Sequence, residues 1–138
     1  MTSISFANQN SKPSFRLTAV EEELMLIIWQ HGASTVKEVK DRLPDDRKLA
    51  YTSISTVLRI LQHKNILTAR KNGREHVYEP SYSLEQYCKA TLDKTVSSFF
   101  SGNVSHLVHY LINHFHLSEN ERTELIQLIE NKKNISRP

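Results

Sequence analysis

Apolar positions recur at helical spacing in two short stretches near the start of the chain, and each stretch has start and stop signals. The first opens at Thr18 and is followed by Gly32, whereas the second opens at Thr35 and stops at Pro44. Both openings have the Thr-x-x-Glu spacing of a capping box, in which side chain and backbone satisfy each other's hydrogen bonds. Glycine and proline are common just after helix ends. The pattern predicts two short amphipathic helices in tandem.

A third stretch, residues 51–64, has two unlike faces. Its apolar positions follow the 3, 4 and 7 offsets of one helix face: Ile54, Val57, Leu58 and Leu61. Its other positions carry short hydroxyls and one arginine: Thr52, Ser53, Ser55, Thr56 and Arg59. Serine and threonine are mediocre helix formers, so their density here needs a reason. Capping of the helix start accounts for Thr52 or Ser53 but not for four hydroxyls.

After Asn65 the period of the pattern changes from helical to two. Residues 67–71 alternate, Asn72-Gly73 is the strongest short-range signal for a β-hairpin, and residues 74–79 form a second extended run before a proline. Each of these signals agrees with the helices that precede them. Three helices followed by a basic two-stranded hairpin predict a winged helix-turn-helix, in a chain that is mainly α with a small β-hairpin wing.

The remainder of the chain has a helical pattern in three segments. They begin near residues 83, 104 and 118, with a break at Ser101-Gly102-Asn103. Three short amphipathic helices bury little core of their own, so we expect them to form a homodimer with a second copy; packing back onto the preceding helices is the alternative. The predicted domains are a flexible tail (1–16), a winged-helix DNA-binding domain (17–80) and a helical dimerisation domain (81–138).

The net charge of the 138-residue chain is only +3, but the charges are segregated. Residues 47–76 hold seven Lys and Arg and one Glu, whereas residues 17–46 hold three bases and seven acids. A basic segment of this kind is the expected footprint of a surface that binds a polyanion. The alternative is a solvated basic face without a partner. The residues of the third helix distinguish a polyanion-binding surface from this alternative.

The third helix and the hairpin supply groups suited to double-stranded DNA. The major groove admits one α-helix, short hydroxyls let its backbone come close, and arginine reaches a phosphate or a guanine edge. Basic hairpin residues beside the groove add affinity for the phosphate backbone. The basic residues have no interleaved aromatic side chains, which disfavours single strands. The candidate DNA-binding residues are Lys48, Tyr51, Thr52, Ser53, Ser55, Thr56, Arg59, Arg70, Lys71 and Arg74.

Several segments together are similar to one known family. They are Leu17 to Trp29, Ser34 to Val39, Tyr51 to Leu61, Asn72 to Tyr78 and Leu117 to Glu121. This set resembles the penicillinase-repressor (BlaI/MecI/CopY) family, over about Leu17 to Lys133. The resemblance implies a homodimeric transcriptional repressor whose winged helix binds a palindromic operator and whose C-terminal helices form the dimer. It matches Thr52, Ser53 and Thr56 to the recognition-helix positions and Arg74 to the wing arginine.

Two features of the family's release mechanisms differ in this chain. Members that respond to β-lactams are cleaved at an Asn-Phe bond, where an ungapped placement puts Lys94-Thr95. Members that respond to copper carry Cys-x-Cys motifs, whereas this chain has the single Cys88. The resemblance therefore implies the DNA-binding module without identifying an inducer.

Other functions have weaker support. His106 and His109 lie on one helix face, as shared metal ligands do, but no carboxylate or thiol is grouped with them. Cys88 as a redox switch and a winged helix that binds protein instead of DNA are further alternatives. No spacing joins a nucleophile to a base, so we expect no enzyme, cofactor or metal. The chain has no apolar run of membrane-spanning length and no signal peptide, which predicts a cytoplasmic protein.

Overall fold

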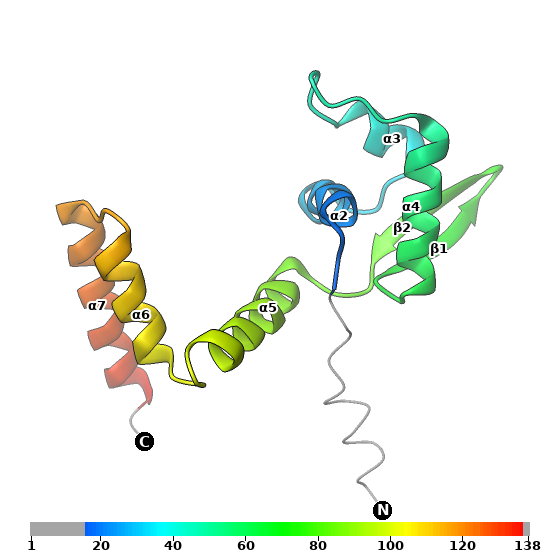
Figure 1. The fold of residues 1–138 in the computed structure, drawn as a ribbon. Coiled ribbons are helices and arrows are strands. Elements are labelled where there is room, and N and C mark those ends of the chain that lie inside the picture. The colour runs from blue at the N-terminus through cyan, green and yellow to red at the C-terminus, as the bar shows by residue number, and fades with distance from the viewer. Residues whose placement is uncertain (1–15, 137–138) are drawn as a thin grey trace, which may run out of the picture. The chain divides into compact units, whose positions relative to one another are not determined.

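The computed structural model describes residues 16–136, so the predicted tail at 1–16 lies almost wholly outside the described residues. The elements in chain order are α2 (Ala19–His31), α3 (Val36–Asp41), α4 (Tyr51–His63), β1 (Leu67–Asn72), β2 (Glu75–Pro80), α5 (Leu84–Phe99), α6 (Val104–His114) and α7 (Glu119–Ser136) (Figure 1). They form two compact units, Met1–Leu92 and Asp93–Pro138. The predicted order of three helices, a hairpin and three further helices is confirmed.

The starts of four helices, α2, α3, α5 and α7, are set by local side-chain hydrogen bonds. The Thr18 hydroxyl accepts from the backbone N–H of Glu21, and the Glu21 carboxylate accepts from the backbone N–H of Thr18, which is the predicted capping box of α2. Thr35 begins α3 in the same way. Reciprocal bonds of the same kind join Ser83 to Gln86 and Ser118 to Glu121 at the starts of α5 and α7. Each start is therefore encoded within four residues.

The first unit is organised around one apolar core to which α2, α3, α4 and the hairpin all contribute. Three of the four predicted inward residues of α4 are fully buried, and the fourth, Val57, is half-buried against them. The core residues are Leu24, Met25, Ile28, Val36, Val39, Leu43, Ile54, Leu58, Leu61, Ile66, Leu67 and Tyr78. Burial on this scale fixes which face of α4 turns inward and leaves the opposite face to the solvent.

The hairpin is antiparallel and is joined to the rest of the first unit at its base. Its register runs from Leu67 opposite Pro80 to Asn72 opposite Glu75, so the two-residue loop is Gly73-Arg74 rather than the predicted Asn72-Gly73. Gly73 has a φ of +68°, a value that glycine adopts without strain. Backbone hydrogen bonds of 2.8 and 2.9 Å join Tyr78 to Ser34, the residue before the α3 cap. The wing therefore has a fixed attachment beside α3 and α4.

The first turns of α5 pack on α2, within the first unit. The Trp29 indole donates a 2.7 Å hydrogen bond to the carbonyl of Tyr82, and its ring lies 5.1 Å from that of Tyr87. The Tyr87 hydroxyl is hydrogen-bonded to the Glu22 carboxylate, and burial together with that carboxylate raises the pKa of Tyr87 to about 12. The compact unit therefore extends past residue 80 to Leu92. The division at residue 80 into a DNA-binding and a dimerisation part stays a prediction.

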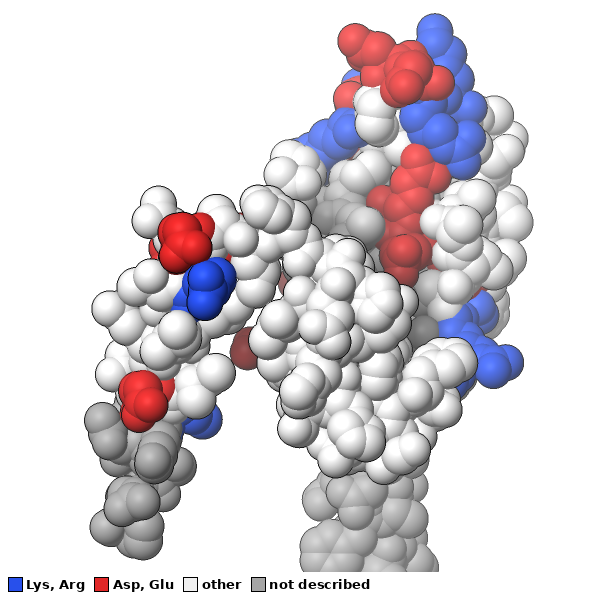
Figure 2. Space-filling model, turned by 60° about the vertical axis from the view of Figure 1, so that its left-hand side comes forward, with Lys and Arg blue, Asp and Glu red and all other residues white. Residues whose placement is uncertain are grey.

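The second unit contains the end of α5 together with α6 and α7, and it has little interior. The break predicted at residues 101–103 is confirmed: Ser101 and Gly102 have positive φ, and the Asn103 side chain caps α6. Val96 is buried, but most large apolar side chains of α6 and α7 are exposed. α6 contains no Asp, Glu, Lys or Arg, and Figure 2 shows the side chains of this unit as mostly uncharged. No helix within residues 16–136 is long and apolar enough to cross a bilayer.

Candidate nucleic-acid interface

The outward face of α4 consists of short polar side chains that the helix does not need for its own start. Its N-cap is Ala50, which makes no side-chain cap hydrogen bond, so capping explains none of the hydroxyls. Thr52, Ser53 and Thr56 are exposed, and Ser55 is half-buried. The Thr56 hydroxyl donates a 2.9 Å hydrogen bond to the carbonyl of Thr52, which leaves its oxygen lone pairs available to accept. The face is therefore a row of small groups on an exposed helix.

A shallow hollow lies between α4 and the wing. It is lined by Thr35, Val36, Tyr51, Ser55, Arg59, Arg74, Glu75, His76 and Tyr78. Four candidate residues, Tyr51, Ser55, Arg59 and Arg74, thus meet although they come from α4 and from the hairpin loop. Thr35 and Glu75 also line the hollow, although neither was among the candidates. Glu75 comes to the hollow because the hairpin register pairs it with Asn72, at the tip of the wing. Arginine side chains from two elements at one hollow suit an anionic ligand strand.

The two basic residues of β1 differ in which side of the hairpin they occupy. Side chains alternate along a strand, and Lys71 pairs with His76, which lines the hollow, whereas Arg70 pairs with Val77. Lys71 therefore shares the α4 side of the hairpin, and Arg70 belongs to the opposite side. Both are exposed, as are Lys48 and Arg74. A DNA duplex on the α4 side of the hairpin can therefore be contacted by Lys71 more directly than by Arg70.

Two members of the basic segment are engaged inside the first unit. Arg47 forms an ion pair with Glu23, and Lys64 forms one with Glu21, so both bases are paired with acids of α2. Counting charges along the chain therefore overstates the basic surface. The exposed bases of the segment that belong to neither ion pair are Lys48, Arg59, Arg70, Lys71 and Arg74, all of which were candidates from the sequence.

The histidines and the cysteine of the C-terminal helices do not assemble into a site. His106 and His109 are exposed, and the His114 ring stacks on Tyr110 at 4.1 Å. Within the part of the chain that the structure describes, no group of three or more His, Cys, Asp or Glu is placed to hold a metal ion. Cys88 is exposed on α5.

These elements define a winged helix-turn-helix protein: a third helix with an exposed hydroxyl face, and a two-stranded wing fixed beside it. A family model described as penicillinase repressor matches residues 17–131. The chain therefore belongs to the penicillinase repressor family, a family of transcriptional repressors, and the resemblance seen in the sequence is confirmed.

Two individual relatives agree with this assignment. The chain is 29% identical over 119 residues to a penicillinase repressor of Bacillus licheniformis, which covers 86% of this chain and 93% of the relative. It is 33% identical over 72 residues to the transcriptional regulator BlaI of Mycobacterium tuberculosis, or 51% of this chain and 52% of that protein. Among solved structures, the DNA binding domain of the repressor BlaI matches at 30% identity over 55% of this chain and 90% of that one, with a TM-score of 0.48.

Proposed function

We propose that this protein is a transcriptional repressor that binds a palindromic operator in duplex DNA as a homodimer, with α4 in the major groove. The observation that carries the proposal is the outward face of α4, where hydroxyls that cap nothing lie beside exposed bases. Membership of a repressor family supports the same function. Selection of bound genomic fragments tests it, with dyad-symmetric fragments as the expected product and absence of any enriched duplex as the result that overturns it.

The first two turns of α4 are suited to reading bases. Side chains at the N-terminal end of a recognition helix reach base edges, and residues as short as Thr52, Ser53 and Thr56 allow the helix backbone to enter the groove closely. The threonine methyl groups suit contact with the thymine methyl, and a hydroxyl group can donate to a base or phosphate oxygen or accept from a base N–H. Lys48, which precedes the helix, and Tyr51 at its first position are exposed and suited to the flanking phosphates.

The wing is suited to the phosphate backbone at the edge of the same groove. Arg59 and Arg74 line one hollow from two sides, so a phosphate strand that crosses the hollow meets both guanidinium groups. Lys71 lies on the same side of the hairpin. These contacts supply affinity and salt dependence rather than sequence preference. Arg70, on the other side of the hairpin, contributes through its charge.

The second unit is suited to pairing with another copy of itself. Apolar side chains on α6, at its C-cap and on α7 are exposed: Val104, Val108, Leu111, Ile112, Phe115, Leu125, Ile126, Leu128 and Ile129. A single chain gains no free energy from holding such groups in water, whereas a dimer buries them. A two-fold dimer places its two α4 helices about one helical turn of DNA apart, or a multiple of it, which requires a palindromic operator.

Replacement of Thr56 by alanine should lower the ratio of specific to non-specific affinity by about tenfold, because a base-edge contact of roughly 1–3 kcal/mol is lost. Thr123→Ala is the matched control, since the Thr123 hydroxyl makes the same kind of bond, 3.0 Å to the carbonyl of Glu119. Fluorescence anisotropy with operator and scrambled duplexes measures both affinities. An unchanged ratio of specific to non-specific affinity for Thr56→Ala would show that Thr56 does not contribute to base recognition.

Replacement of Arg74 by alanine should weaken specific and non-specific binding about equally. The loss of one phosphate contact flattens the plot of log affinity against log salt by about one unit per subunit. Lys94→Ala, which removes an exposed base of α5, is the control and should leave the slope unchanged. If neither Arg74→Ala nor Thr56→Ala alters binding to any duplex, the docking of α4 and the wing proposed above is wrong.

A further inference from the structure

Both flanks of α4 are tied to α2 by ion pairs. Arg47 lies in the connection just before α4 and pairs with Glu23, whereas Lys64 is the C-cap residue of α4 and pairs with Glu21. Each basic member comes from the basic segment and each acidic member from the first turns of α2. The proposed function uses neither pair directly, since none of these four residues is among those assigned to DNA contact.

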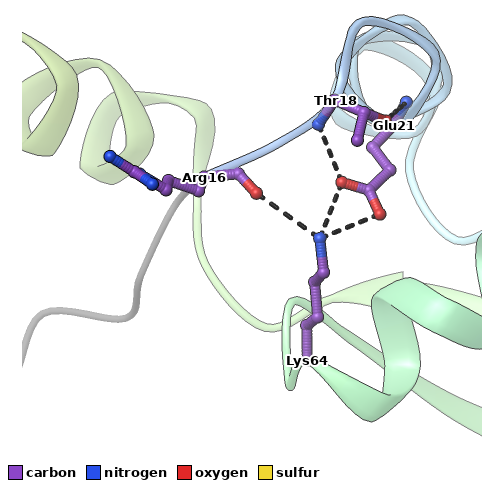
Figure 3. A network of polar contacts seen from close by, with 4 residues as sticks. All are labelled: Arg16, Thr18, Glu21 and Lys64. Atoms are coloured by element: carbon purple, nitrogen blue, oxygen red, sulfur yellow. Dashed lines mark hydrogen bonds and ion pairs between the residues drawn. The ribbon is translucent and has the colours of Figure 1, made fainter.

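The Lys64–Glu21 pair is buried on its acidic side and saturated with hydrogen bonds (Figure 3). Glu21 is only 4% exposed, and its two carboxylate oxygens each lie 2.9 Å from Lys64 Nζ. Burial raises the pKa of Glu21, but the bonds from Lys64 and from the Thr18 backbone outweigh it and leave the pKa below its usual value. The carboxylate is therefore ionised at neutral pH and held from two elements.

Lys64 has no donor left for a phosphate. An ammonium group has three N–H donors, and Nζ of Lys64 contacts both Glu21 oxygens and the carbonyl of Arg16, the last at 3.4 Å. A move of Lys64 toward DNA would leave the buried Glu21 carboxylate without its counter-charge, which costs far more than a surface contact gains. Lys64 is therefore basic in the sequence without being part of the basic surface.

The Arg47–Glu23 pair fixes the other flank. Arg47 Nε lies 3.1 and 2.9 Å from the two oxygens of Glu23, and this hydrogen bond raises the pKa of Arg47. Both side chains are half-exposed, so the pair contributes little to global stability. The pair instead fixes the position of the backbone at Arg47, and the connection from Arg47 leads directly into the first turn of α4.

We infer that Arg47 and Lys64 are positioning residues that set the orientation of α4 on α2 for operator reading, an inference that rests on the proposed function. α4 has 13 residues and is about 20 Å long. A tilt of about 10° at one end displaces the other end by about 3 Å, which is more than the range over which a hydrogen bond survives. Anchors at both flanks keep the hydroxyl face in register with two or more base pairs.

The first test compares Lys64→Met with Lys48→Met. Both lysines flank α4, but Lys64 is ion-paired with Glu21, whereas Lys48 is exposed and is assigned to DNA contact. Lys64→Met should lower operator affinity by tenfold or more and leave the salt slope of non-specific binding unchanged. Lys48→Met should flatten that slope by about one unit per subunit. Lys64→Arg should restore operator affinity to within a few-fold, because it too can donate to Glu21. A flattened slope for Lys64→Met, or an unchanged operator affinity, overturns the inference.

The second test exchanges the charges of the half-exposed pair, where the fold tolerates substitution, and it decides the matter if Lys64→Met does not fold. Arg47→Glu should lower operator affinity by about tenfold, and the double variant Glu23→Arg with Arg47→Glu should recover most of it. A direct phosphate contact at Arg47 predicts no recovery, because position 47 stays acidic. A wild-type chain that binds no duplex would instead overturn the proposed function, which these variants do not address.

Discussion

Aspartate in place of both Ile112 and Ile129 should convert the proposed dimer to a monomer and weaken binding to the proposed operator by about 10²- to 10⁴-fold, the range by which linking two binding modules exceeds one. Both side chains are more than half exposed, 55% and 64%, on the apolar faces of α6 and α7. A charge placed on an apolar face that the proposed dimer buries must be desolvated. Each subunit then binds its half-site alone.

Sedimentation equilibrium and operator titration measure the two effects separately. Asn113→Asp with Gln127→Glu is the control, since it adds the same charge to exposed polar positions of the same helices. A chain ending at Leu92 should also be monomeric, and it retains the packing of Trp29 on Tyr82 and Tyr87 that a cut after Pro80 would break. A double aspartate variant that remains dimeric would locate the interface outside α6 and α7.

Most helix starts were predictable because their determinants are local; α4, whose N-cap Ala50 makes no side-chain hydrogen bond, is the exception among the described helices. The capping box of Thr18 with Glu21 spans four residues, and Asn103 caps α6 through the backbone N–H groups of Ser105 and His106. Such a pair acts regardless of what the rest of the chain does. The hairpin was placed correctly but its loop was displaced by one residue, because register depends on the pairing of Tyr78 with Ser34 and on the core as well as on turn chemistry.

The electrostatics of the candidate site could not be predicted in the same way. Arg47 and Glu23 are 24 positions apart, and Lys64 and Glu21 are 43 apart, so only the packing of α4 on α2 brings each pair together. A charge count along the chain treats all four as surface charges. The same holds for Tyr87 and Glu22, whose contact carries the first unit past the predicted boundary at residue 80. Long-range pairs of this kind require the tertiary fold.

Replacement of Leu58 by alanine should destabilise the first unit by about 2–5 kcal/mol, the usual cost of removing a buried leucine together with the cavity that it leaves. Leu58 is 0% exposed at the centre of the inward face of α4. For a domain of this size the loss corresponds to a fall in Tm of about 10 °C or more. Thermal melts followed by circular dichroism at one fixed protein concentration measure it, because the Tm of any dimer depends on concentration.

Ile60→Ala is the matched control, since Ile60 lies on the same helix, two residues along, and is 42% exposed. It should change the free energy of unfolding by less than about 0.5 kcal/mol. Thr56 lies two residues before Leu58 and is exposed, so Thr56→Ala should lower DNA-binding specificity without lowering the free energy of unfolding. The binding assay and the thermal melt therefore report on opposite faces of α4. Equal destabilisation by Leu58→Ala and Ile60→Ala would mean that α4 is turned differently on the core, and the hydroxyl face could not then be the one presented to DNA.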